Sequence, residues 1–488
     1  MMLSKMLSRA SAFVNRGTLN IRMGGLPLSF TNVVRRGIST SPVQNDGAAE
    51  RGVVKEVPDK TDPQELLLHK LHVENGAHFV GFKGFQMPWK YEGKPLANEV
   101  LFTRREASVF DASYRPQFYL RGKYISKIME TMVTSDLQEM KPDEAVLTLM
   151  TNPQGGIIDD LLVTKLNENE LHVVANTPKT MKIIEKNTRM FENEVEMTIP
   201  KDMTLLTFQG PECSKLLQLL ILDNVRCLPF MHSLQGDSVF WTEVSRLTRC
   251  SDIGEDGFMM SLPVTYAEEF LSYAVSNNSR DLILIGLRAR EALRIEAGHC
   301  LSGVDYNEET TPVQAKLDNL IGNRRRVEGK FPGADIILKE LNDKSNTILR
   351  VGFFASGSCN VGSPIMDPKG HRIGKVTSAC FSPCLQKHIG IGYVATEFAQ
   401  NGKELLFNDD IKGIAAEIPL VKNRSYTNLS SFWLEPERER EREREIQRIL
   451  VQQWRPLPRP PPAEEYEWDV ETLDEVCKTD TESTPCLY

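Results

Sequence analysis

Two adjacent carboxylates, Asp159 and Asp160, are the residues of this chain best suited to do chemistry. They follow the sequence Asn-Pro-Gln-Gly-Gly at residues 152–156, which has the composition of a tight turn. They interrupt an apolar run at residues 157–163 that predicts a β-strand. Because neighbouring side chains of a strand point to opposite faces, one carboxylate should face the interior or a cleft. A carboxylate held there needs a compensating partner, as in many catalytic sites. The alternative is a loop carboxylate satisfied by the amides of the turn.

Arginines form a second group of residues with chemical potential. Arg290 and Arg294 lie four apart in a segment, residues 282–297, whose pattern predicts a helix that ends at Gly298, so they share one face. Three consecutive arginines follow at residues 324–326. Guanidinium groups near a loop suit an anionic ligand or an acidic partner protein. The alternative is a solvated charged face, which is the commoner place for isolated arginines.

The composition argues against several classes of function. A chain of 488 residues can bury a large core and is expected to hold two or three domains. Its formal net charge of −8 argues against a nucleic-acid-binding surface. No apolar run is long enough to span a bilayer, so we expect no membrane segment. The nine cysteines lack the paired spacing of a zinc site, which predicts free thiols and no metal centre.

The two ends of the chain differ in kind from its middle. Residues 1–44 contain no Asp or Glu and space lysine and arginine among apolar residues and serine, which is typical of a mitochondrial transit peptide. The alternative is an unrelated basic tail. Residues 45–60 are expected to be a linker. Residues 428–488 combine strict Glu-Arg alternation with a proline-rich run and are predicted to be a disordered tail.

Between these ends, helix and strand patterns follow one another irregularly. Asp62 and Pro63 have the composition of a helix start, and that helix should end at Asn75 and Gly76. Strands are expected at residues 118–120, 145–150, 157–165, 171–175, 203–208 and 258–262. Further helices are expected near residues 123–134, 179–191, 211–221 and 267–275. The mixture predicts an α+β fold.

The pattern becomes all-β from about residue 348. Short runs bounded by Gly, Pro and Asn replace the helices. These runs are residues 351–354, 363–366, 373–376 and 389–394. They predict a small barrel or sandwich.

Short collinear motifs over residues 66–426 carry a resemblance to a known family. They are the turn and carboxylate pair at 151–160, Phe-Gln-Gly-Pro at 208–211, Gly-Glu-Asp-Gly at 254–257, Leu-Arg-Ile-Glu-Ala-Gly at 293–298, Phe-Pro-Gly-Ala at 331–334 and Gly-Lys-Val-Thr-Ser at 374–378. Together they resemble the aminomethyltransferase family, the T-protein of the glycine cleavage system. Each motif alone is a weak signal, whereas the series is specific.

The resemblance implies a fold and an activity. The fold is a three-domain cloverleaf around a central folate channel, with a C-terminal all-β barrel. We therefore expect folate-binding aminomethyltransferase domains at residues 61–335 and the barrel at residues 336–427. The implied enzyme transfers a one-carbon unit from the lipoyl-bound aminomethyl group of the H-protein to tetrahydrofolate, and releases ammonia. The implied cofactor is tetrahydrofolate, the partner is the lipoylated H-protein, and the location is the mitochondrial matrix.

The resemblance also assigns roles to single residues. The family's catalytic carboxylate is the second Asp of the pair, here Asp160, which could hold the pteridine, stabilise the developing cation and aid proton transfer. The arginine matched by Arg290 helps to hold the acidic part of the ligand. The other implied folate-binding positions are Asn176, Leu147, Val174, Met259 and Asp252.

Some of these positions depart from the family pattern. Met259 stands where the family has a glutamate that grips the pterin ring, and Asp252 stands where it has a tyrosine. Arg115, His172 and Ser425 are further substitutions. Loss of the glutamate leaves pterin donors unpaired at a cost of ~1–3 kcal/mol, although Asp252 could supply a replacement carboxylate. A catalytically weak paralogue that binds folate or partner proteins without turnover is therefore the alternative to an active enzyme.

Overall fold

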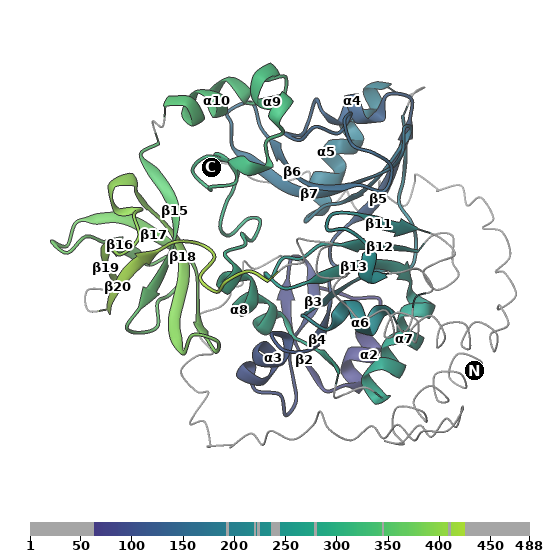
Figure 1. The fold of residues 1–488 in the computed structure, drawn as a ribbon, viewed down its shortest axis with the longest axis horizontal. Helices are drawn as coiled ribbons and strands as arrows, with labels where there is room; N and C mark the ends of the chain where they lie inside the picture. Colours follow the sequence, from purple (N-terminus) through teal and green to yellow (C-terminus); the bar gives the residue numbers. More distant parts are fainter. Residues whose placement is uncertain are drawn as a thin grey trace, which may run out of the picture. The chain divides into compact units, whose positions relative to one another are not determined.

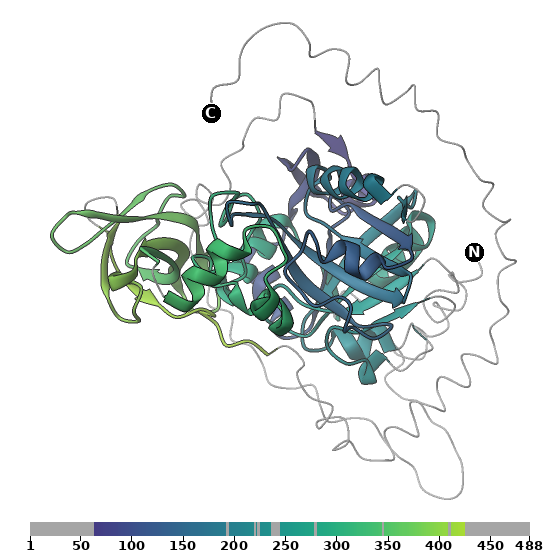
Figure 2. The ribbon, with the colours of Figure 1, turned by 90° about the horizontal axis from the view of Figure 1, so that it is seen from above.

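The computed structural model describes residues 63–424 except for residues 192–194, 219–220, 222–224, 236–244, 278–280, 344–345 and 408–410 (Figures 1 and 2). The expected transit peptide, linker and tail lie outside the described residues, as do Asp62 and Ser425. The described part combines helices with three open sheets and a closed barrel, which confirms the expected α+β fold. None of the helices in these ranges is long and apolar enough to cross a membrane.

A five-stranded sheet carries the carboxylate pair. In spatial order its strands are β6 (Ala145–Thr151), β7 (Ile157–Asn167), β8 (Glu170–Val174), β5 (Gln117–Gly122) and β9 (Val195–Thr198), all antiparallel to their neighbours. The helices that follow β5 and β8 are α4 (Ile125–Met129), α5 (Pro178–Thr188) and η2 (Arg189–Phe191). Ile125 and Ile184 of these helices share a buried apolar cluster with Leu161 of β7. Four of the strands, β5 to β8, fall where the sequence predicts them, whereas β9 was not predicted. Helix α4 is shorter than expected because Val133 forms a β-bridge with Met150 instead.

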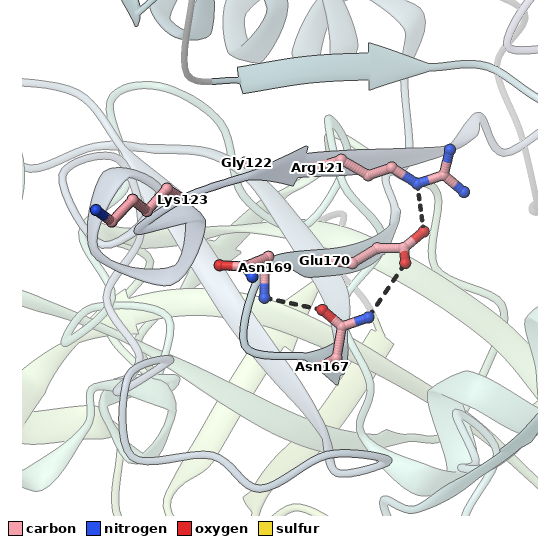
Figure 3. A pocket seen from close by; sticks show the side chains of 6 residues that line it. All are labelled: Arg121, Gly122, Lys123, Asn167, Asn169 and Glu170. Carbon is pink, nitrogen blue, oxygen red and sulfur yellow. Dashed lines mark hydrogen bonds and ion pairs between the residues drawn. The ribbon is translucent and has the colours of Figure 1, made fainter.

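A surface pocket lies at the hairpin end of this sheet (Figure 3). Its lining residues are Arg121, Gly122, Lys123, Asn167, Asn169 and Glu170. Asn167 is seven residues beyond Asp160 on β7, which places the pocket about 23 Å along the strand at about 3.3 Å per residue. Arg121 and Glu170 form an ion pair of 2.8 Å on its wall. The pocket is therefore separate from the carboxylate pair.

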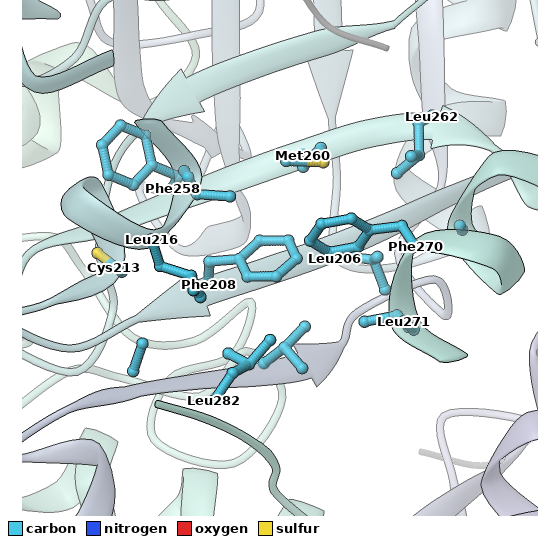
Figure 4. Close-up of a cluster of buried hydrophobic side chains, with 14 of the residues drawn as sticks. Leu206, Phe208, Cys213, Leu216, Phe258, Met260, Leu262, Phe270, Leu271 and Leu282 are labelled. Atoms are coloured by element: carbon cyan, nitrogen blue, oxygen red, sulfur yellow. The ribbon is translucent and has the colours of Figure 1, made fainter. Parts of the chain in front are cut away.

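A six-stranded sheet forms the second layer. In spatial order its strands are β11 (Ser233–Gln235), β12 (Arg246–Arg249), β13 (Gly257–Pro263), β10 (Met203–Gln209), β4 (Ala107–Asp111) and β14 (Leu282–Leu284). Apolar side chains of α2 (His69–Glu74), α6 (Cys213–Gln218), η3 (Val225–Cys227) and α7 (Val264–Asn277) pack on one face. Phe208 meets Phe270 edge to face at 5.6 Å in this core (Figure 4). Phe258 and Met260 belong to the same core, so Met259 between them must point to the opposite face.

The N-terminal elements differ from the sequence prediction. Gln64–Glu65 form a short strand, β1, that pairs in parallel with β3 (Phe85–Tyr91), and β3 also pairs with β2 (Ala77–Phe82). The prediction of a helix starting at Asp62 and Pro63 was therefore wrong, because Gln64 and Glu65 form backbone pairs with β3 instead. The helix α2 begins at His69. The predicted end was correct, because Gly76 adopts φ +74° directly after α2.

The arginine-rich helix is also shorter than its pattern. The predicted segment at residues 282–297 divides into β14 and α8 (Leu287–Ala297), because its first three apolar residues pair in parallel with β4. Gly286 separates the two elements, and a Cβ there would lie 2.2 Å from the carbonyl oxygen of Trp89. The predicted helix end at Gly298 is confirmed, with φ +75°. Helix α3 (Leu96–Thr103) packs beside α8.

The C-terminal part is a closed barrel, and the alternative of a sandwich is excluded (Figures 1 and 2). Around the barrel the strands are β15 (Ile348–Ala355), β18 (Lys387–Ala395), β17 (Arg372–Ser382), β16 (Pro364–Met366), β19 (Glu404–Phe407) and β20 (Ile411–Ala416). The core of the barrel includes Val351, Phe353 and Phe407.

Short helices lie on either side of the first barrel strand in the sequence. Between α8 and β15 they are η5 (Asp318–Leu320), α9 (Asn323–Glu328) and α10 (Ala334–Asp343), and between β18 and β19 there is η6 (Thr396–Phe398).

Candidate active site

A turn fixes the start of β7 and so the position of both carboxylates. The side-chain oxygen of Asn152 accepts hydrogen bonds from the backbone nitrogens of Gln154, at 3.0 Å, and Gly156, at 2.9 Å. A Cβ on Gly156 would lie 1.7 Å from the carbonyl oxygen of Glu308, so only glycine lets these two loops meet. The predicted turn is therefore confirmed, and its contact with the loop that carries Glu308 explains why it needs the second glycine.

Asp159 is the fully buried member of the pair. Its carboxylate accepts hydrogen bonds from Asn176, Thr180 and Ser302, over distances of 2.7–3.1 Å. Burial raises the pKa of Asp159, as does the neighbouring charge of Asp160, whereas the Thr180 and Asn176 donors lower it. Because its oxygens are already used by donors from three elements, Asp159 holds the site together. The alternative of a loop carboxylate satisfied by turn amides is excluded, since both carboxylates lie within β7.

Asp160 is half-buried, and although its Cβ leaves the strand on the opposite side from that of Asp159, the two carboxylates share the Nδ2 donor of Asn176. Its Oδ1 accepts a hydrogen bond from Asn176 Nδ2 at 2.9 Å and another from the hydroxyl of Tyr306. Burial raises the pKa of Tyr306 well above its usual value, and the charge of Asp160 raises it further. Tyr306 therefore stays protonated and donates. The arrangement leaves a carboxylate that is oriented by two donors and still reaches solvent, as a base for a bound ligand requires.

The barrel anchors the loop that carries Tyr306. Arg294 of α8 donates to Asp305 Oδ2 at 2.5 Å and to Glu291 Oε2 at 2.6 Å. Asp305 in turn accepts hydrogen bonds from Thr377 and Ser378 of β17, at 2.6 and 2.7 Å. The proposed role of Arg294 in binding an external anion is thus not needed, because its charge is balanced within the protein.

Three of the predicted apolar site residues lie near Asp160. Residues directly opposite in antiparallel strands share a face, and the register pairs Leu147 with Leu162 and Leu162 with Val174. Leu162 is two residues from Asp160 and therefore on its face of the sheet. Met259, from the other sheet, belongs to the same buried cluster as Leu162 and Val174. The structure thus brings Leu147, Val174 and Met259 together on the side of Asp160.

Asp252 and Arg290 form an ion pair beside this cluster. Arg290 Nη2 donates to Asp252 Oδ2 at 2.5 Å, and Gln209 Nε2 donates to Asp252 Oδ1 at 2.6 Å. Burial alone would raise the pKa of Asp252, but Arg290 and Gln209 hold it at about 2. The Arg290 guanidinium lies 5.4 Å from the ring centre of Phe110. Any ligand acid that Arg290 binds must therefore share it with Asp252.

Two cationic residues of the site were not assigned a role by sequence reasoning. Charged side chains around Lys83 act on its pKa. Asp159 and Asp160 raise it, whereas Arg115 and Arg290 lower it. Arg115 is buried and donates to the carbonyl oxygen of Ala175, at 3.3 Å. No local pattern marks Lys83 because its burial depends on the contact of a hairpin with other parts of the chain. Tyr306 and Ser302 were missed because their partners, Asp160 and Asp159, are 146 and 143 residues away in the chain.

The arginine run at residues 324–326 is paired with groups of the protein itself. Arg324 Nη2 lies 2.6 Å from Glu130 Oε1, and Arg325 Nη2 donates to the carbonyl oxygen of Glu130 at 2.5 Å. Arg326 donates to the carbonyl oxygen of Asp318. These internal partners do not support the interpretation of the run as a site for an anionic ligand or an acidic partner. They do not support the alternative of a purely solvated charged face either. Among the described residues no His, Cys, Asp and Glu cluster could hold a metal ion, and the seven described cysteines are free thiols.

Comparisons with known proteins agree with this fold. The GCVT N-terminal domain family matches residues 68–325, and the glycine cleavage T-protein C-terminal barrel domain family matches residues 350–422. The mitochondrial aminomethyltransferase of Canis lupus familiaris is 37% identical over 370 residues, which cover 74% of this chain and 90% of the relative. That of Homo sapiens is 37% identical over 378 residues, covering 75% and 92%. The crystal structure of glycine cleavage system aminomethyltransferase T from Bartonella henselae matches with a TM-score of 0.69 at 29% identity, over 75% of this chain and 99% of that one.

Proposed function

This chain belongs to the T-protein family of the glycine cleavage system and is an aminomethyltransferase, and we propose that its acceptor is tetrahydrofolate and its donor the lipoylated H-protein. The observation that carries the proposal is the half-buried carboxylate of Asp160, which Asn176 and Tyr306 orient beside an apolar cluster. The alternative of a paralogue without turnover is not favoured by relatives that are named as enzymes.

The residues present fit a folate. The apolar side chains of Leu147, Val174 and Met259 suit the faces of a flat ring. Asp160 offers a carboxylate to a polar edge of the ring, and Arg290 offers a cation to an acidic group. Arginine has five N–H donors, so Arg290 can keep Asp252 and still donate to a ligand carboxylate. Both requirements of the ligand, an apolar surface and opposite charge, are met within the described residues.

The chain's own residues then have separable roles in the transfer. Bound tetrahydrofolate supplies the amine that accepts the one-carbon unit. The carboxylate of Asp160 stabilises positive charge that develops beside it and can accept a proton at its oxygen. Asn176 and Tyr306 keep that carboxylate in one orientation, which lowers the entropic cost of the transition state. Asp159 carries none of the chemistry and fixes the position of Asn176.

Two measurements test the proposal. Isothermal titration of the purified chain with tetrahydrofolate should give saturable one-site binding. Addition of an H-protein that carries the lipoyl-bound aminomethyl group should then release one ammonia for each one-carbon unit transferred. A chain that binds tetrahydrofolate and releases no ammonia would be the paralogue without turnover, and a chain that does not bind it would lose the proposed acceptor.

We expect Met259→Glu to tighten tetrahydrofolate binding. Met259 faces the cluster of Leu162 and Val174 and offers no hydrogen-bond acceptor there, whereas the family has a glutamate at this place. One restored charge-assisted hydrogen bond should increase the affinity about 10- to 100-fold. Titration calorimetry measures the change, and Met259→Leu, which adds no acceptor, is the matched control. Equal affinities of the Glu variant and the parent, together with full binding by Asp252→Ala, would show that position 259 does not touch the ring.

The same titration shows whether Asp252 has taken over the role of the lost glutamate. If it has, Asp252→Ala should abolish binding and Met259→Glu should change little. If Asp252 only balances Arg290, the Ala variant should keep its folate affinity but lose stability, because the largely buried guanidinium loses its 2.5 Å partner and keeps only the 3.4 Å contact with Glu291.

We also propose that the precursor is imported into the mitochondrial matrix. The support is the acid-free composition of residues 1–44 and the names of the relatives, which are mitochondrial enzymes. We expect trimming between about Arg36 and Asp46, which mass spectrometry of the mature protein measures. A reporter fused to residues 1–50 that stayed in the cytosol would contradict the proposal.

A further inference from the structure

Lys83 lies at the tip of a tight hairpin that enters the site. The hairpin joins β2 to β3 by a two-residue turn, Lys83 and Gly84, because Phe82 pairs directly with Phe85. Lys83 has φ +50° and Gly84 has φ +81°, the backbone of a type I′ turn. Such a turn follows the natural twist of the two strands and is stiff. The backbone therefore aims the Lys83 side chain in a fixed direction.

The ammonium of Lys83 is buried and has no hydrogen-bond partner among the described residues. Its Nζ lies 5.8 Å from the ring centre of Phe82 and 5.9 Å from that of Tyr114, so its surroundings include two aromatic faces. Burial lowers the pKa of Lys83 to about 8, although the charges of Asp159 and Asp160 raise it. The protein therefore keeps a desolvated amine near its catalytic carboxylate without an ion pair to balance it.

Such an arrangement costs stability unless it serves binding. An ammonium carries three N–H donors, and buried donors nearly always have partners. Cation–π contacts offset part of the lost hydration but accept no strong N–H hydrogen bond. The nearby arginines, Arg115 and Arg290, add positive charge. The missing partner is therefore an acceptor that the folded chain does not itself supply.

We propose that Lys83 is a ligand-binding residue of this site, whose ammonium donates a hydrogen bond to a carbonyl oxygen on the ring of the bound folate. The proposal rests on the proposed function, since it takes tetrahydrofolate as the ligand. The proposal also states which group of the ligand the site recognises. Met259 offers the ring no hydrogen-bond acceptor, whereas Lys83 offers donors. The site therefore selects a ring by its acceptor oxygen.

Lys83→Met separates binding from folding. Methionine has a similar length and suits the neighbouring aromatic rings, but has no N–H donor. We expect tetrahydrofolate affinity to fall about 10- to 100-fold, as for the loss of a hydrogen bond from a charged donor. We expect Tm at pH 7 to rise or stay unchanged, because the variant removes a buried unpaired charge. A structural role for Lys83 predicts the opposite result, a lower Tm. Lys123→Met, at an exposed lysine of the surface pocket in Figure 3, is the control and should change neither quantity.

The pH dependence gives a readout that a packing role would not move. The ligand needs the protonated form of Lys83, so the affinity of the parent should fall as pH rises from 7 to 9 through the Lys83 pKa of about 8. Burial raises the pKa of Tyr114 above its usual value of 10, and although burial alone would lower the pKa of Arg290, the charge of Asp252 raises it above its usual value. The affinity of Lys83→Met should therefore be independent of pH between 7 and 9 apart from changes in the ligand, which are common to both proteins.

The outcomes separate this proposal from the proposed function. The probes are tetrahydrofolate and 6-methyltetrahydropterin, which has the ring but no glutamate tail. An affinity loss of equal size for both probes in Lys83→Met places the acceptor on the ring, as proposed. A loss confined to tetrahydrofolate overturns the ring assignment. A Lys83→Met protein that binds as tightly as the parent overturns this proposal and leaves the proposed function standing, whereas a parent that binds neither probe overturns both.

Discussion

Asp160→Asn should lower the rate of aminomethyl transfer at least about 100-fold, because a positioned general acid or base contributes roughly that factor or more. The substitution keeps the size of the side chain but removes its charge and its basicity. Tyr306 and Asn176 both donate to Oδ1, so an amide oxygen can keep those two hydrogen bonds. The loss should therefore appear in kcat with little change in folding. Ammonia release from the aminomethyl-loaded H-protein measures it.

Asp159→Asn is the matched control for this experiment. Asp159 faces the other side of the strand and its two oxygens accept from Asn176, Thr180 and Ser302. An amide there turns one acceptor into a donor that meets other donors, at a cost of ~1–3 kcal/mol in stability. We expect a lower Tm and a smaller loss of turnover than for Asp160→Asn. If Asp160→Asn worked as fast as the parent, Asp160 would have no part in the mechanism.

Arg294→Met should destabilise the protein by about 3–5 kcal/mol, the usual cost of removing one partner of a buried ion pair. Arg294 is 3% exposed, and its removal leaves the carboxylate of Asp305 buried without a cation and leaves Glu291 only its longer contact with Arg290, at 3.4 Å. It also breaks the 2.9 Å hydrogen bond to Ser378 of the barrel. Thermal unfolding should show a Tm lower by several degrees. Because Asp305 precedes Tyr306, turnover should fall as well.

Arg189→Met tests whether burial of the ion pair is the cause of the expected stability loss in Arg294→Met. Arg189 pairs with Glu185 at 2.7 Å within one exposed stretch of chain, where its side chain is 70% exposed. Exposed pairs of this kind contribute roughly 0.3–0.5 kcal/mol, so Tm should hardly change. Equal shifts of Tm for the two variants would show that the Arg294 network is not a stabilising centre of the fold.

The sequence by itself determined the local features of this protein. The strand pattern at residues 157–165 placed both carboxylates on β7, and strand geometry required them to face opposite sides. Gly298 ended α8 as predicted, since glycine enters the left-handed region at little cost. The short runs after residue 348 predicted the all-β part, although β19 and β20 were not recognised. These features depend on residues close together in the chain, which is why pattern and propensity suffice.

Tertiary structure alone decided which residues surround the carboxylates. Tyr306 is 146 residues from Asp160, and Ser302 is 143 residues from Asp159, so no local pattern could pair them. The pairing of Arg290 with Asp252 and the burial of Lys83 likewise depend on how a hairpin, two sheets and α8 meet. The first residues of the segment at 282–297 became β14 because an edge of β4 was there to pair with them. Local sequence sets the intrinsic preference of each segment, but burial and charge depend on long-range contacts that form only when the segments pack together.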